Sequence, residues 1–228
     1  MTTRVAARRI RCGILCLPLA GFVYLESLVV AGEYIYPSDD LRGFADQVTS
    51  VRFQSSLLVD HLQASLLLVG GIALYAYLFN SRAERWALAG LILLCVSTIV
   101  AGMDLGTNLW QIPAAQAYLE GQQSALDAAL LGDDPTNYPL LPSVWLIVTG
   151  YLFRILSNVF FGIAIWRSRT LPQGAAILWV GATVLGVASL NPSFFLGAWI
   201  EALVVALDLG GSGWIAYSVW QQPVARMP

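Results

Sequence analysis

The chain has 228 residues, of which 57% are hydrophobic and only 11% are charged, and its mean hydropathy is +0.68. A water-soluble domain carries roughly 25% charged residues, so this composition excludes an ordinary soluble fold. The formal net charge of -2 and the lack of a basic tract exclude nucleic acid as an expected partner. All 12 basic residues are arginine, which excludes Schiff-base chemistry and P-loop nucleotide sites, because both need a lysine.

Six runs of about 20 apolar residues, the length that crosses a bilayer core, follow one another along the chain. They cover residues 12–32, 55–79, 87–110, 143–166, 172–190 and 194–220. The alternating pattern of a membrane β-barrel is absent, so the spans are expected to be helices. We therefore predict an all-α polytopic bundle of six transmembrane helices that forms a single membrane domain over 1–228.

Both loops on the predicted external side, 33–54 and 111–142, contain a further helical pattern. Residues 38–40 are Ser-Asp-Asp, a good helix start, and LRGFADQV after them predicts a short amphipathic helix. In the longer loop, AAQAYLEGQQSALDAALLG is typical of a helix that ends at Gly132. Such a helix can serve as a connector that rests on lipid headgroups or as a lid over an opening.

The positions of the arginines predict the orientation of the six spans. With six crossings, nine arginines fall on one side of the membrane, in the N-terminal segment, the 80–86 and 167–171 turns and the C-terminal tail. The external loops hold only Arg42 and Arg52. Because arginine is retained on the cytoplasmic side, we expect both termini in the cytoplasm and the protein in a bacterial cytoplasmic membrane.

Ionisable side chains interrupt the predicted spans, where they are costly and usually face the bundle interior or a wet cavity. From a rise of about 1.5 Å per residue, four of the acids lie roughly 6 to 10 Å outward of the midpoints of their spans. Arg154 and Asp208 fall near the midplane. We therefore predict a polar layer in the outer half of the bilayer, above an almost purely apolar inner half. The seven positions are Glu26, Asp60, His61, Asp104, Arg154, Glu201 and Asp208.

Two interpretations of this layer remain open. In the structural one, Arg154 is neutralised by one or two carboxylates, and the other groups form hydrogen bonds between helices. In the functional one, a protonated acid donates a proton, an ionised acid or His61 accepts one, and Arg154 is an electrostatic anchor. Asp208 and Glu201 are favoured as the acid pair.

The functional interpretation assigns specific roles along the helices. The candidate catalytic residues are Asp208, Glu201, Asp60, Asp104, Glu26 and His61. The candidate substrate-binding residues are Arg154, Asn158, Tyr151, Asn108 and Trp199. One histidine and three cysteines cannot build a zinc tetrahedron or a bis-histidine haem site, so neither a metal nor a cofactor is expected.

These features favour an intramembrane enzyme that acts on a lipophilic small molecule by acid–base chemistry. Cyclisation or isomerisation of an isoprenoid or polyketide-like molecule suits a site with acids and few nucleophiles. A small proton-coupled transporter is the first alternative, although it predicts a second polar layer on the cytoplasmic side and internal repeats. A membrane partner subunit without chemistry of its own is the second alternative.

Two stretches carry a resemblance to a known family. PSDDLRGFADQVTSVRFQSSLLVDHLQASLLLVGGIALYAYLF and FFGIAIWRSRTLPQGAAILWVG resemble the bacterial membrane family called domain of unknown function 4386. The resemblance covers about two thirds of the chain and implies six helices, with Arg52 and Asp60 as positions of interest, but it implies no activity. The long loop and the sixth span, with Glu201 and Asp208, depart from that family.

Overall fold

The computed structural model describes residues 3–31, 40–122, 124–126, 142–189 and 198–223, and within these ranges it contains helices and no strand. The chain is therefore all-α, as the sequence predicts. The helices in chain order are α1 (Thr3–Ile14), α2 (Cys16–Ala31), α3 (Leu41–Thr49), α4 (Val51–Leu78), α5 (Glu84–Leu119), α7 (Pro142–Ser168), α8 (Gln173–Ser189) and α9 (Ala198–Gln221).

Four stretches of the described chain are helical, long and apolar enough to cross a membrane. They are Val51–Leu78, Glu84–Leu119, Val148–Ser168 and Ala202–Gln221. The apolar helix α2 has 16 residues and α8 has 17. The first predicted span, 12–32, is divided between two helices, because α1 ends at Ile14 and α2 begins at Cys16.

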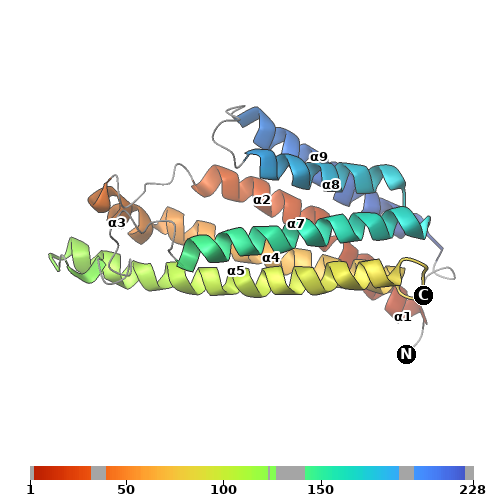
Figure 1. Ribbon diagram of the computed structural model, residues 1–228, viewed down its shortest axis with the longest axis horizontal. Coiled ribbons are helices and arrows are strands. Elements are labelled where there is room, and N and C mark those ends of the chain that lie inside the picture. Colours follow the sequence, from red (N-terminus) through yellow and green to blue (C-terminus); the bar gives the residue numbers. More distant parts are fainter. Residues whose placement is uncertain (1–2, 32–39, 123, 127–141, 190–197, 224–228) are drawn as a thin grey trace.

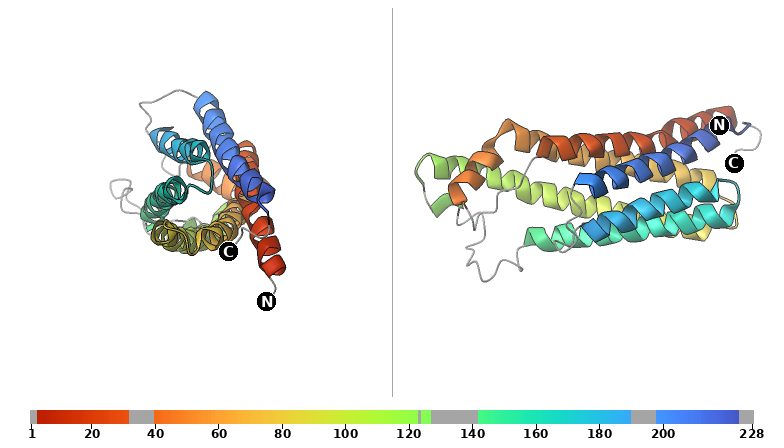
Figure 2. Two further views of the ribbon diagram at one scale, coloured as in Figure 1. Left: turned by 90° about the vertical axis from the view of Figure 1, so that its right-hand side faces the viewer. Right: turned by 90° about the horizontal axis from the view of Figure 1, so that it is seen from above.

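The long helices form a closed ring in which neighbours in the chain are neighbours in space. α2 packs on α4, α4 on α5, α5 on α7, α7 on α8 and α8 on α9, and α9 returns to pack on α2. The end-on view in Figure 2 shows this circular arrangement, and Figure 1 shows that α1 begins and α9 ends at the same end of the bundle. At that end the Arg11 guanidinium donates a hydrogen bond to the backbone carbonyl of Gln222, which joins α1 to the segment after α9.

Small residues and serines bring the helices of the ring together. A Cβ on Gly13 would lie 2.7 Å from the Cβ of Ala73, so this glycine permits close contact between α1 and α4. Between α5 and α7, Ser97 Oγ donates to the Gly150 carbonyl at 2.9 Å, and Ser157 Oγ donates to the Gly90 carbonyl at 2.8 Å. These hydrogen bonds fix the register of the two helices.

The opposite end of the molecule carries a small second core. Asp40 caps α3 by accepting a hydrogen bond from the Gly43 N–H at 2.9 Å, which confirms the helix start predicted there. α3 packs on the last turns of α5 and, to a lesser extent, on α4. The residues of this core that are fully buried are Phe44, Ala45, Val48, Ala115 and Leu126. Figure 1 shows α3 and the end of α5 projecting beyond α8 and α9.

The length of α5 differs from the prediction, which ended this span at residue 110. The helix continues through Pro113 to Leu119 and has 36 residues, which corresponds to about 54 Å. A bilayer core is about 30 Å thick, so α5 extends well beyond it. Proline removes a single backbone hydrogen bond from the helix. Ala115, two residues later, is buried in the core with α3, and this packing holds the helix together past Pro113. Residues 114–119 are helical as predicted, but they continue α5 and do not belong to a separate loop helix. The predicted helix is interrupted at 120–122, residues 124–126 are again helical, and 123 and 127–132 lie outside the described residues.

Candidate functional site

Most of the described candidate residues form two groups along the bundle, an outer group nearer the end that carries α3 and a deeper group nearer the other end. The outer group comprises Asp60 and His61 of α4 with Asp104 and Asn108 of α5, and the deeper group is centred on Asp208 of α9. The side chains of Glu26, Glu201 and Trp199 lie outside the described residues, so the predicted pairing of Glu201 with Asp208 stays a prediction.

In the outer group, α4 and α5 bring two carboxyl groups together. Asp60 and Asp104 lie within electrostatic range of each other. Asn108, one turn further along α5, donates from Nδ2 to Asp104 Oδ2 at 3.3 Å and to the Asp104 backbone carbonyl at 3.1 Å. His61 lies at the same helix contact, with its Cε1 atom 3.8 Å from the position that a Gly102 Cβ would occupy. The contact therefore gathers two acids, an amide and an imidazole.

Asp60 is exposed although it lies on the packing face of α4. Eighteen residues make five helical turns, so Asp60 points in the same direction as Leu78, which is fully buried. Leu67 and Gly71, within about 20° of the same direction, are also buried. The Asp60 side chain is nevertheless exposed. The Asp60 side chain is therefore accessible at this point, although Ser56 and Gln63 on the neighbouring turns of α4 are buried.

The deeper group holds one carboxylate among three other helices. Asp208 receives a side-chain hydrogen bond from the indole of Trp179 on α8 and lies within electrostatic range of Arg154 on α7. A Cβ on Gly21 of α2 would lie 2.9 Å from Asp208 Oδ2, so the glycine makes room for this oxygen. Ser212 Oγ donates to the Asp208 backbone carbonyl at 2.6 Å. These contacts give the Asp208 carboxyl group an indole donor and a nearby cation.

A chain of hydrogen bonds connects this group to the next turn of α7. Asn158, one turn after Arg154, is buried and donates from Nδ2 to Thr183 Oγ1 at 2.9 Å. Thr183 Oγ1 in turn donates to the Trp179 backbone carbonyl at 3.1 Å. Trp179 and Thr183 are absent from the residues predicted from sequence. Their spacing of four residues places both on one face of α8, and this is the pattern that could have identified them.

The separation in depth of the two groups follows from helix contacts. Leu17 of α2 packs on Gly70 of α4, with contacts as short as 2.5 Å from a Gly70 Cβ position. Gly21, which lies beside Asp208, is four residues after Leu17, or about one turn nearer the outer end of the bundle. Because α4 runs antiparallel to α2, this depth corresponds to four residues before Gly70, which is about residue 66. Asp60 is six residues beyond that, or about 9 Å. The structure thus divides the predicted polar layer into an outer acid pair and a deeper anchored acid.

Below both groups the ring is filled by apolar side chains. Phe161 of α7 is fully buried and stacks on Trp179 with ring centroids 6.2 Å apart. Its ring also lies 3.0 Å from a Cβ position on Gly90 and 3.6 Å from one on Gly71, which places it between α4, α5 and α8. Leu74, Ile165 and Ile215 are also fully buried in this half. The apolar inner half that the sequence predicts is therefore a packed core.

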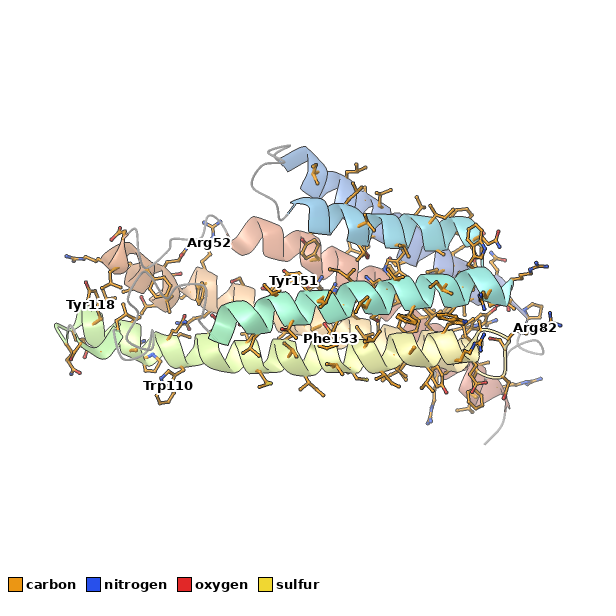
Figure 3. All side chains as sticks on the ribbon, viewed as in Figure 1. Arg52, Arg82, Trp110, Tyr118, Tyr151 and Phe153 are labelled. Atoms are coloured by element: carbon orange, nitrogen blue, oxygen red, sulfur yellow. The ribbon has the colours of Figure 1, made fainter. Side chains whose placement is uncertain are left out.

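Tyr151, a predicted substrate-binding residue, and Trp110 both lie at the surface. Tyr151 is 50% exposed, and Figure 3 shows it on the opposite side of α7 from Phe153. Trp110 is 71% exposed and projects away from the bundle beyond α5 (Figure 3), which suits an anchor at the membrane interface better than the wall of a pocket. Within the described residues, no three His, Cys, Asp or Glu side chains come close enough together to hold a metal ion.

Comparison with known proteins returns no relative for this fold or site. No protein-family model, no curated protein and no solved structure matches the chain. The resemblance to the family with Arg52 and Asp60 stays a prediction, and the function has to be argued from the site itself.

Proposed function

We propose that the ring is a six-span membrane bundle with both termini on the cytoplasmic side of a bacterial inner membrane. The support is the distribution of positive charge. Eight described arginines lie at one end of the bundle: in α1, at the start of α5, at the end of α7 and in the turns beside them. Arg42 and Arg52 lie at the opposite end. Figure 3 shows Arg82 and Arg52 at these two ends. Four crossings are the four long apolar helices. The helix pair α1 and α2 would supply a fifth crossing, and α8 would supply a sixth.

We further propose that the protein is an intramembrane enzyme that acts on a lipophilic substrate by acid–base chemistry. The observation that carries this proposal is the outer acid pair, Asp60 and Asp104, at an inward-facing helix contact where Asp60 remains exposed. Two carboxyl groups within electrostatic range disfavour simultaneous ionisation, so that one can serve as a proton donor and the other as an acceptor. An apolar molecule can approach this pair from the membrane without crossing the packed inner core.

The reaction that suits these groups best is an isomerisation or cyclisation of an isoprenoid-like alkene. The protonated carboxyl gives its proton to one alkene carbon, which leaves a cation on the neighbouring carbon. The second carboxylate, or His61, then removes a proton from an adjacent carbon, and a new double bond forms. The step consumes no oxidant or reductant, and the enzyme recovers its proton.

In this proposal the deeper group stabilises the intermediate and holds the helices in place, and it does not take part in proton transfer. Asp208 is surrounded by the Trp179 indole, the Arg154 cation and Gly21. When ionised, this carboxyl group can stabilise a cationic intermediate from a distance, and its hydrogen bond with Trp179 ties α8 and α9 together. A transporter is disfavoured because Phe161 and its neighbours close the inner half, where a coupled carrier needs a second polar layer.

The test compares acid variants in cells that express the full chain. Organic extracts are profiled by mass spectrometry for wild type, Asp60→Asn, Asp104→Asn and the control Asp46→Asn, which removes an exposed acid of α3. We expect wild type and D46N to produce the same new lipophilic isomer, and D60N and D104N to lose at least a hundredfold of it while retaining the size-exclusion profile of wild type. A product unchanged in both D60N and D104N would reject the acid pair as the catalytic group.

A chemical probe gives a second test that needs no substrate. Dicyclohexylcarbodiimide is an apolar reagent that modifies protonated carboxyl groups within membranes. We expect one modification per chain, mapped to Asp60 or Asp104, and its loss in the double variant D60N/D104N. Modification confined to Asp208 or to the loops would contradict the proposal.

A further inference from the structure

The end of the bundle at which α5 begins and α7 ends is strongly cationic. We call it the arginine-rich end, and within the described residues it holds one acid, Glu84. Its described arginines are Arg4, Arg8, Arg9, Arg11, Arg82, Arg85, Arg167 and Arg169. Most of them are exposed, so this end presents positive charge to whatever lies against it.

Two of these arginines converge on a single indole. The guanidinium carbon of Arg85, in the first turn of α5, lies 5.6 Å from the Trp86 ring centroid, and that of Arg167, in the last turn of α7, lies 5.1 Å from it. The Trp86 ring is itself fixed by stacking on Phe160, with centroids 5.6 Å apart. Cation–π contacts of this kind hold a guanidinium in place without neutralising its charge. The geometry therefore gathers two cations from two helices at one fixed point.

The one nearby acid is engaged elsewhere. Glu84 Oε2 accepts a hydrogen bond from the backbone N–H of Asn80 at 3.0 Å, which closes the turn between α4 and α5. The first N–H groups of α5 add positive potential at the same place, because a helix N-terminus favours anions. Both arginines are exposed, so their remaining N–H donors can reach an external ligand.

We propose that Arg85 and Arg167, positioned by Trp86, form a binding site for the phosphate group of an anionic glycerophospholipid. Guanidinium groups bind phosphate oxygens through paired N–H donors. In the proposed membrane placement, on which this inference rests, Trp86 would lie near the depth where lipid headgroups meet acyl chains. The lipid would join the start of α5 to the end of α7, the two helices that also carry Asp104 and Arg154. This inference is independent of the proposed enzymatic function.

The test uses the delipidated full chain in a neutral detergent and matched pairs of variants. Arg85→Gln with Arg167→Gln removes the proposed site, and Arg8→Gln with Arg82→Gln removes two exposed arginines of the same end that do not contact Trp86. Dioleoyl phosphatidylglycerol is the probe, with dioleoyl phosphatidylcholine and inorganic phosphate as comparison ligands. Binding is read by native mass spectrometry and by the temperature at which the protein aggregates.

We expect wild type and R8Q/R82Q to retain one phosphatidylglycerol, and the apparent Kd to rise about tenfold or more in R85Q/R167Q, as for the loss of charge-assisted hydrogen bonds. Equal loss in the two variants would overturn the site in favour of general charge. An equal response to inorganic phosphate would overturn the assignment to a lipid. If the double variant does not fold, the single variants R85Q and R167Q each have to show a loss that R8Q and R82Q lack.

Discussion

Substitution of Gly211 by alanine tests the contact between α8 and α9 that places Trp179 against Asp208. A Cβ on Gly211 would lie 2.7 Å from the Trp179 backbone nitrogen and 2.9 Å from the Ala175 carbonyl oxygen. Because both neighbours are backbone atoms, no side-chain rotation can relieve the overlap. α8 has to move away from α9, and the hydrogen bond from the Trp179 indole to Asp208 is lost or lengthened.

The magnitude follows from two opposing effects. Overpacking of this kind costs about 1–3 kcal/mol, and the gain in helix propensity from glycine to alanine returns about 0.5–1 kcal/mol. The net loss lies within about 0–2.5 kcal/mol, and we take about 1–2 kcal/mol as the expected value because the overlap is with backbone atoms. For a chain of this size it corresponds to a decrease in Tm of roughly 2–8 °C.

Gly213 supplies the matched control two residues along the same helix. No heavy atom lies within 4 Å of a Cβ at that position. Gly213→Ala should therefore leave Tm unchanged or raise it by about 1–4 °C. The assay is thermal unfolding of the purified protein in detergent, followed by intrinsic fluorescence. Equal Tm values for the two variants would refute the close backbone contact between α8 and α9.

Three further predictions follow from other contacts. Thr183→Val removes the acceptor of the buried Asn158 amide and should lower stability by about 1–3 kcal/mol in a thermal melt, whereas Thr183→Ser should restore most of it; equal behaviour would exclude that hydrogen bond. Phe161→Ala should cost about 3–5 kcal/mol by the same measurement, and a cost below about 1 kcal/mol would contradict a packed inner half. In a cysteine-free background, Ser81→Cys should react with an impermeant thiol reagent only from the cytoplasmic side and Gln122→Cys only from the outside, and reversed labelling would reject the orientation.

The helical pattern was predictable because apolar runs of span length have few alternatives in a membrane. The composition predicts the all-α class, and Ser38-Asp39-Asp40 before an amphipathic run predicts α3. The ends of the helices were harder to predict from the sequence. Pro113 indicates the end of a helix by local rules, but α5 continues past it because Ala115 is buried in one core with residues of α3, which are distant in sequence.

The types of residue in the site were predictable from the sequence, but which of these residues contact one another was not. Ionisable residues within spans identify Asp60, Asp104 and Asp208, because buried charge in lipid is rare without a reason. Which acids meet depends on the order of helices around the ring and on their relative depth, and both are set by glycine contacts between helices. Trp179 illustrates the limit, since its role arises only when α8 and α9 approach at Gly211.

The most direct test of the acid pair as a substrate site is an experimental structure of the full chain in lipid nanodiscs. The account predicts elongated lipid-like density in the outer half that ends between Asp60 and Asp104, above a filled core at Phe161. A map in which helix side chains fill the space around both carboxyl groups, with no bound molecule, would contradict it and favour a structural or partner-binding role.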